Sequence, residues 1–432
     1  MRLRIGVFGF LVCGAIAQAQ TPAARSDSGP PTVTLADAIQ RSLQVQPAMV
    51  TAVGNQRNAD AARTSAFGTF LPSVTAGWSA SKSSQSRFDN NRSVLIPPTW
   101  NYGFNVNASV DLFDGLRRIW NVKSASAVQD AADAGYISQR FVTELQTKGA
   151  FFAALANQEL LRVAQAQLQR TDQELKAAAD KLRFGAATRA DSLTAAVDHG
   201  NAEVALLQAQ ANLTGAQATL ARQIGVSGLV QPAADSTIPP LPDTAGLLAA
   251  AVDNAPLVQQ ADAQATAARA NVLSARSQYL PTFNVSFGDT RSDTTFGGGF
   301  LHGHVTRWTF GASLPLFNGF VREQNQVSAN VTRDIAVATA ADTRRNIAAQ
   351  LAQQVAALVA AYHQMDIAQA NRASATEALR VQQQRYAAGA GLLLDLLTAE
   401  ANLTQAEATL IQARFTYRTT RATIESLVGK EL

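Results

Sequence analysis

Leu112-Phe113-Asp114-Gly115 returns later in the chain as Leu316-Phe317-Asn318-Gly319, and both copies stand where one hydrophobic period gives way to another. Before the first copy, Trp100 to Leu112 places apolar residues at every second position, which is the period of a strand with one apolar face. After it, Leu116 to about Arg183 contains no proline and is rich in Ala, Gln, Leu and Glu, which favours one very long helix. The motif therefore marks a switch from strand to helix that occurs twice.

Other segments recur in the same order, which indicates that the chain contains two copies of one structural unit. The matching pairs are Phe70-Leu71-Pro72 with Tyr279-Leu280-Pro281, and Asp191-Ser192-Leu193-Thr194-Ala195 with Asp395-Leu396-Leu397-Thr398-Ala399. A cluster of prolines separates the copies, and proline both stops helices and stiffens a linker. We therefore expect a first repeat at 20–230, a proline-rich linker at 231–242 and a second repeat at 243–432.

Each repeat has two stretches with the strand period, which predicts four strands arranged as two hairpins. Their expected ranges are about 73–84, 99–113, 282–292 and 304–317. A soluble sandwich would show the same alternation. We favour membrane strands because aromatic residues lie near the strand ends and because roughly 10 residues match a tilted bilayer crossing. Four strands do not close a barrel, and an open edge in hydrocarbon leaves backbone groups unpaired, so the chain is expected to oligomerise.

Helical periods fill the rest of both repeats. One helix is expected from Thr34, which can cap it, to about Ala66, with a counterpart in the second repeat. Long helical hairpins are expected at 116–225 and 320–428, and their first arms at roughly 1.5 Å per residue would be near 100 Å long. Such rods predict coiled-coil packing, and a cytosolic antiparallel coiled coil is the competing interpretation. The expected class is an α+β membrane protein with long antiparallel coiled-coil hairpins, four transmembrane strands and an internal two-fold repeat.

The N-terminal segment has the features of an export signal. Two arginines precede the apolar run Ile5 to Ala17, and the small residues that follow fit cleavage after Ala19. The run is too short to span a bilayer as a helix, although an uncleaved anchor is the alternative. Cys13, the single cysteine, lacks the surroundings of a lipoprotein signal. We therefore expect a signal peptide at 1–19 and an exported chain that is not lipidated and contains no cysteine.

The composition argues against several other functions. Charged residues make up 16% of the chain, and 36 Lys+Arg against 32 Asp+Glu occur without basic runs, so no nucleic-acid partner is expected. His302 and His304 stand close together, but no cysteine lies nearby, and we expect no metal and no other cofactor. The glycines at 297–299 precede neither a lysine nor a helix, and no nucleophile elbow is present. We therefore expect no enzyme activity.

Together, in order and duplicated, these features resemble the TolC-type outer-membrane efflux protein (outer membrane factor) family over essentially everything after the export signal. The resemblance rests on the two-fold repeat, the Leu-Pro before each first strand, the Leu-Phe-(Asp/Asn)-Gly after each second strand, and the turn pattern Arg385-Tyr386 through Gly389, Asp395, Leu397 and Ala399. It implies an outer-membrane channel-tunnel. Three chains would complete a trimeric 12-stranded barrel, continued by a helical tunnel across the periplasm.

The resemblance also implies a passive function and partners. The tunnel would be the exit duct of a tripartite efflux pump or a type I secretion system, joined to a periplasmic adaptor (membrane fusion) protein and an inner-membrane transporter. Gly185 and Gly389 would be adaptor contacts at the hairpin tips. Two alternatives stay open: a self-sufficient outer-membrane porin, disfavoured by the long helices, and a periplasmic structural coiled coil, disfavoured by the aromatic strand ends. The cargo is not set by these residues, because a passive duct takes its specificity from the pump.

A periplasmic gate is implied near the tips. Tyr386 occupies the position of a tyrosine that bonds an aspartate, Asp191 occupies that partner's position, and Asp395 would form an acidic, cation-favouring ring in a trimer. Thr398 and Gly391 stand where the family pattern has a second acid and an arginine, so we expect a less acidic entrance. The alternatives are ordinary seam packing for Tyr386 and helix N-terminal charge for both aspartates.

Overall fold

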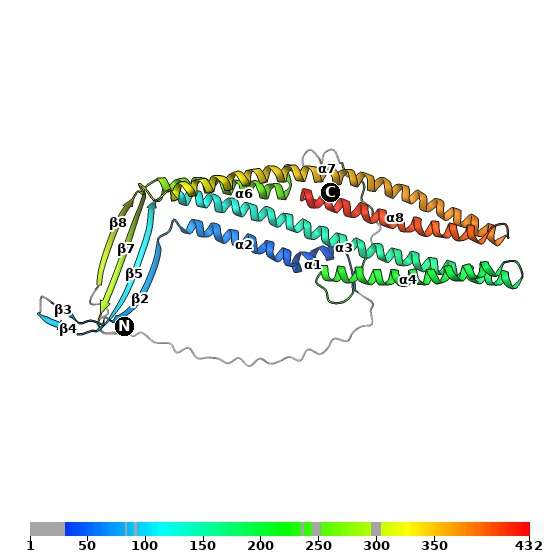
Figure 1. The fold of residues 1–432 in the computed structure, drawn as a ribbon, viewed down its shortest axis with the longest axis horizontal. Coiled ribbons are helices and arrows are strands. Elements are labelled where there is room, and N and C mark those ends of the chain that lie inside the picture. The colour runs from blue at the N-terminus through cyan, green and yellow to red at the C-terminus, as the bar shows by residue number, and fades with distance from the viewer. Residues whose placement is uncertain (1–30, 83, 90–92, 235–236, 244–251, 295–303) are drawn as a thin grey trace, which may run out of the picture.

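The computed structural model describes residues 31–82, 84–89, 93–234, 237–243, 252–294 and 304–432. The described part is elongated, with an antiparallel sheet at one end and helices that run from it to two tips at the other end (Figure 1). The expected signal peptide at 1–19 lies outside the described residues, as do His302 and the glycines at 297–299. Among the described helices, none combines the length and the apolar character that a membrane crossing requires.

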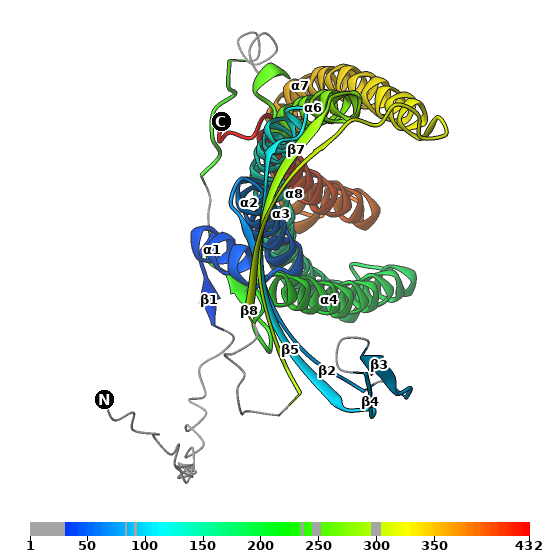
Figure 2. The same cartoon turned by 90° about the vertical axis from the view of Figure 1, so that its left-hand side faces the viewer.

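Four antiparallel strands form the main sheet, in the spatial order β2 (Ser73–Lys82), β5 (Trp100–Phe113), β7 (Thr282–Asp293) and β8 (His304–Ser313). The two hairpins, β2–β5 and β7–β8, are joined along β5 and β7. Aromatic residues pair across strands on one face, with Trp78 opposite Phe104 and Phe287 opposite Trp308. Viewed from this end, the strands form a curved strip (Figure 2). Within the described chain, β2 and β8 each have one unpaired edge.

Two features of the sheet differ from the sequence expectation. β8 ends at Ser313, short of residue 317, because Pro315 has no N–H to donate to a neighbouring strand. The segment between β2 and β5, for which the sequence analysis predicted no strand, contains a small hairpin of β3 (Arg87–Asp89) and β4 (Val94–Ile96).

Long helices continue directly from the sheet. The first pair is α3 (Arg117–Arg183) with α4 (Arg189–Gln223), here hairpin 1, and the second is α7 (Val321–Ala387) with α8 (Leu393–Val428), here hairpin 2. Gly115 and Leu116, at φ +71° and +68°, turn the chain from β5 into α3 through two left-handed residues. Gly319 and Phe320 do the same before α7, at φ +69° and +64°. The Leu-Phe-x-Gly motif thus supplies the glycine that this turn needs.

Shorter helices with fully described bounds lie against the long ones: α1 (Leu35–Val45), α2 (Pro47–Gly68) and α6 (Pro256–Arg276), the last followed by the 3-10 turn η1 (Ser277–Tyr279). The expectation of one helix from Thr34 to about Ala66 was wrong. Pro47 excludes the helical conformation from the residue before it, so Gln46 is extended, at ψ 127°, and α1 ends there. The expected cap is present, since the Asp37 N–H donates to Thr34 Oγ1 at 3.2 Å.

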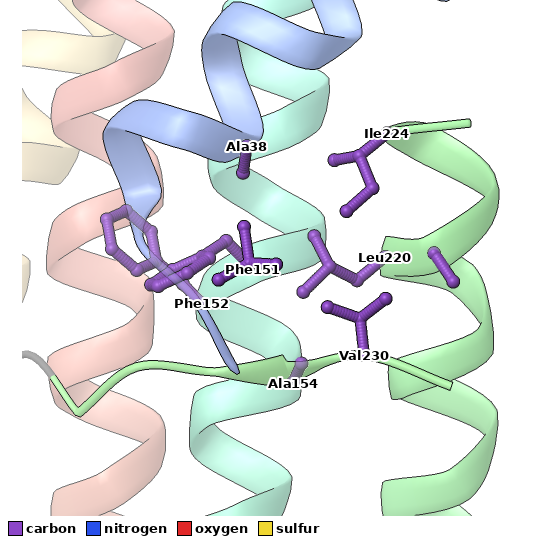
Figure 3. Packing of buried hydrophobic residues seen from close by; sticks show 9 residues of the cluster. Ala38, Phe151, Phe152, Ala154, Leu220, Ile224 and Val230 are labelled. Carbon is purple, nitrogen blue, oxygen red and sulfur yellow. The ribbon is translucent and has the colours of Figure 1, made fainter. Parts of the chain in front are cut away.

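The buried core lies where the short segments cross the long helices. Phe151 and Phe152 of α3 pack with Ala38 of α1 and with Leu220 and Ile224 of α4 (Figure 3). Beside them, β1 (Thr32–Val33) pairs in parallel with β6 (Gln231–Pro232).

The proline-rich linker continues from β6 across α8. The Tyr417 hydroxyl donates to the Pro239 carbonyl at 2.8 Å, and Arg418 donates to the Thr237 carbonyl at 2.7 Å. These bonds hold the connection between the two halves against hairpin 2.

Candidate functional site

Both hairpins turn at the end of the molecule away from the sheet (Figure 1). Gly185 and Gly389 lie in these turns, and each has a φ of +73°, a conformation that favours glycine. The N–H of Ala186 donates to the Lys181 carbonyl at 2.7 Å, and the N–H of Ala390 donates to the Arg385 carbonyl at 2.9 Å. Both tips are therefore Schellman turns, which gives each glycine a structural reason of its own.

Tyr386, in the last turn of α7, is buried. Its side chain packs with an apolar cluster from α7 and α8: Leu379, Leu393, Leu396, Ala399 and Leu403. Its hydroxyl has no hydrogen-bond partner among the described residues. Burial raises the pKa of Tyr386, and the negative charges of Asp191 and Glu174 raise it further. The seam packing considered for Tyr386 is therefore present, and Asp191 is close enough to act on the ring electrostatically.

Asp191 lies in the first turn of α4 and is held within its own hairpin. Its Oδ2 accepts from the Thr188 N–H at 3.0 Å and from the Thr188 hydroxyl at 2.8 Å, while its own N–H donates back to Thr188 Oγ1. These bonds form a capping box, and they lower the pKa of Asp191. The helix N-terminal role considered for this aspartate is therefore present in the structure.

Asp395 lies in the first turn of α8, at the same level of its hairpin as Asp191, but it is not engaged in a cap. The N-cap residue, Leu392, has no side-chain acceptor. Asp395 is exposed and forms no ion pair with another described residue. Its carboxylate is therefore free to face solvent or a neighbouring molecule.

Lys181 joins the two tips, and the sequence analysis did not identify it. Its Nζ donates to the Tyr386 carbonyl at 2.5 Å and lies 3.4 Å from the centroid of the Tyr386 ring. Lys181 lies in the last turn of α3 and Tyr386 in the last turn of α7, so this contact connects hairpin 1 to hairpin 2. No local pattern marks Lys181, which looks like an ordinary basic residue in a last helical turn.

A buried pair of carboxyl groups lies nearby, between α3 and α8. Glu174 is 8% exposed and Glu400 is 4% exposed, and both oxygens of Glu174 lack a hydrogen-bond donor among the described residues. Burial, and next the neighbouring Glu400 carboxyl, raise the pKa of Glu174 to about 9. The sequence contains one signal for this site, since Leu393, Leu396, Glu400 and Leu403 have coiled-coil spacing that places Glu400 in the seam.

The described residues contain no group of three or more His, Cys, Asp or Glu side chains arranged to hold a metal ion. The tips contain packed aromatic and apolar groups, several cations, of which Lys181 contacts the opposite hairpin, and several carboxylates. Contacts among these groups can hold the tips of the two hairpins together, and loss of the contacts can release one tip from the other.

A comparison of the whole sequence with protein families bears on this arrangement of strands and tips. The model of the outer membrane efflux proteins matches residues 38–226 and 247–430. The chain belongs to the outer membrane efflux protein family. It is an efflux channel of the outer membrane and not an enzyme.

Individual relatives are distant in sequence. The outer membrane efflux protein BepC of Brucella suis biovar 1 is 22% identical over 353 residues, which are 80% of this chain and 74% of that protein. Among solved structures, the outer membrane protein VceC of Vibrio cholerae has a TM-score of 0.78 at 19% identity, covering 92% of this chain and 96% of that one. The outer membrane channel CmeC of Campylobacter jejuni has a TM-score of 0.78 at 16% identity, covering 99% and 94%. This efflux protein therefore shares their fold.

Proposed function

We propose that this efflux protein is one subunit of a homotrimer that forms the passive exit duct of a tripartite efflux pump or a type I secretion system. The observation that carries the proposal is a four-stranded sheet with open edges at β2 and β8, placed on helices of 67 residues. In lipid, unpaired strand edges are excluded, and three such sheets joined edge to edge give a closed 12-stranded barrel. At about 1.5 Å per residue, the helices extend roughly 100 Å.

Exposed apolar stripes on the helices support the same assembly. On α4, the residues Leu193, Val197, Val204 and Leu207 are each more than half exposed, and they follow heptad spacing. Val327, Val331 and Ile335 form a second exposed stripe on α7. Stripes of this kind are seams without a partner helix, and a neighbouring subunit would cover them.

The placement of this duct in the cell follows from the same proposal. The barrel would lie in outer-membrane lipid and the helical tunnel in the periplasm, after export by a cleavable signal peptide and without lipidation. The tips, with Gly185 and Gly389, would contact a periplasmic adaptor that connects to an inner-membrane transporter.

The equal lengths of α3 and α7 and the identical φ angles of the two tip glycines support an origin of the chain by internal duplication.

We further propose that Asp191, Tyr386 and Asp395 belong to a periplasmic gate. All three lie at the tips, and Asp395 is exposed and unpaired among the described residues. Around a threefold axis, three Asp395 carboxylates would form a constriction that favours cations.

Single-channel recording in planar bilayers tests this function. We expect the purified protein to give small, cation-selective currents that a trivalent cation blocks from the periplasmic side. Asp395→Ala should lose both the selectivity and the block. Asp172→Ala is the matched control, because Asp172 is an acid of α3 already paired with Lys176 at 2.6 Å. Large, steady currents without selectivity, unchanged by Asp395→Ala, would instead indicate an open porin.

A further inference from the structure

The contact between Lys181 and Tyr386 has two parts, and neither involves the tyrosine hydroxyl. The Lys181 ammonium donates to the Tyr386 backbone carbonyl at 2.5 Å, and it lies over the face of the ring at 3.4 Å from the centroid. The Tyr386 hydroxyl itself has no partner among the described residues. The charge of Lys181 therefore contacts both the main chain and the side chain of Tyr386, in the last turn of α7.

Each part of this contact is favourable for a physical reason. The carbonyls of a last helical turn have few partners and carry partial negative charge, which favours a cation at that position. The face of an aromatic ring also attracts a cation, most strongly where water is excluded. Tyr386 is 9% exposed and Lys181 is half-buried, so both contacts are partly shielded from solvent.

The nearby acid is engaged elsewhere. Asp191 Oδ2 accepts two hydrogen bonds from Thr188 in its own hairpin, and the described residues include no ion pair between Lys181 and Asp191. Gly391, where the family pattern has an arginine, supplies no charge. Among the described residues, Lys181 connects one tip to the other by direct polar contact.

We propose that Lys181 is a latch residue, whose ammonium group holds the tip of hairpin 2 against hairpin 1 and thereby keeps the entrance of the duct closed. This inference rests on the proposed function as a gated duct. The latch depends on the charge at residue 181 and on the ring and carbonyl at residue 386. It does not depend on the hydroxyl of Tyr386, which distinguishes it from a tyrosine–aspartate hydrogen bond.

Four variants of the full-length trimer test the latch. Lys181→Met keeps most of the side-chain length and removes the charge, Lys181→Arg keeps the charge, and Tyr386→Phe removes only the hydroxyl. Lys176→Met is the matched control, because the ammonium of Lys176 is bound to Asp172 within α3. In planar bilayers, we expect Lys181→Met to raise the open probability about tenfold or more, the change that loss of a hydrogen bond from a charged donor produces. Lys181→Arg and Lys176→Met should conduct like the wild type, and Tyr386→Phe should raise the open probability less than Lys181→Met does.

A second readout separates this inference from the proposed function. Hydrogen exchange of the amides at residues 388–392 should be faster in Lys181→Met than in the wild type or Lys181→Arg, in trimers that remain intact on a denaturing gel. If the wild type forms no channel but this exchange pattern appears, the duct proposal fails while the tip contact stands. If the wild type conducts and Lys181→Met changes neither current nor exchange, the latch is refuted. Opening by Tyr386→Phe as large as that by Lys181→Met would refute it as well.

Discussion

Glu174 of α3 and Glu400 of α8 are both buried in the seam between the two hairpins, close enough for the Glu400 carboxyl to raise the pKa of Glu174. Two carboxylates cannot bond unless one is protonated, and both oxygens of Glu174 lack a donor among the described residues. The seam between hairpins 1 and 2 therefore favours the neutral form of Glu174.

This pair predicts a pH-dependent stability. Burial, and next the neighbouring Glu400 carboxyl, raise the pKa of Glu174 from 4.5 to about 9, against the lowering effect of Arg170. Between these values, the folded chain holds a proton that the unfolded chain has released, so the free energy of unfolding falls as the pH rises. We expect the thermal unfolding midpoint to decrease from about pH 5 to about pH 9, and Glu174→Gln to flatten this decrease.

Glu377→Gln is the control for the pH experiment. Glu377 is exposed on α7, and the Arg380 hydrogen bond lowers its pKa, so its titration lies below the tested range. A Glu174→Gln protein that keeps the full wild-type slope would show that the pair does not carry the pH dependence.

The capping box of α4 predicts a local loss of stability at the tip of hairpin 1. Thr188→Ala removes the hydroxyl that accepts from the Asp191 N–H, at a cost of about 1 kcal/mol. We expect faster hydrogen exchange in the first turn of α4 and a similar effect from Asp191→Ala, because each variant breaks one half of the same capping box. If Asp191→Ala opens the channel and Thr188→Ala does not, Asp191 has a role in the gate beyond the cap.

The two faces of β8 predict opposite tolerance to charge. Phe310 is 76% exposed on the apolar face, while Thr309 points to the other side of the sheet. A lysine facing lipid costs about 2–4 kcal/mol at the bilayer midplane, so Phe310→Lys should reduce the yield of trimers in the outer-membrane fraction. Thr309→Lys should assemble normally, since it would face the lumen. Equal yields of the two variants would contradict a lipid-facing surface at Phe310.

A buried ion pair connects α3 to α8 below the tips. Lys148 Nζ lies 2.5 Å from Glu425 Oε2, and the two side chains are 14% and 9% exposed. Lys148→Met leaves the buried carboxylate with weaker partners, Arg421 at 3.5 Å and the Leu432 N–H at 3.4 Å, so we expect a loss of about 3 kcal/mol of unfolding free energy. The double variant Lys148→Met/Glu425→Leu should recover much of this loss. Denaturant unfolding of the wild type and the variants measures these free energies. A double variant as unstable as the sum of the single variants would show that the two residues act independently.

Much of the architecture was predictable because it depends on local patterns. The period of two identified the strand Trp100 to Leu112, and the proline-free run after Gly115 identified α3. The expectation of a single helix from Thr34 to Ala66 missed the break before Pro47. The proline ring restricts the backbone of Gln46, and this restriction outweighed the helical period of the sequence. The tip positions of Asp191 and Asp395 also followed from sequence, because both lie just after turn glycines in the two repeats.

By itself, the sequence determined where strands, long helices and turns lie, because hydrophobic period, proline and glycine act through neighbouring residues. Only the tertiary structure decided that Lys181 contacts Tyr386 and that Glu174 lies near Glu400. These partners lie more than 200 residues apart. Their meeting depends on how α3 packs along hairpin 2, and a shift of one helical turn between the packed helices would separate them while leaving every local pattern unchanged.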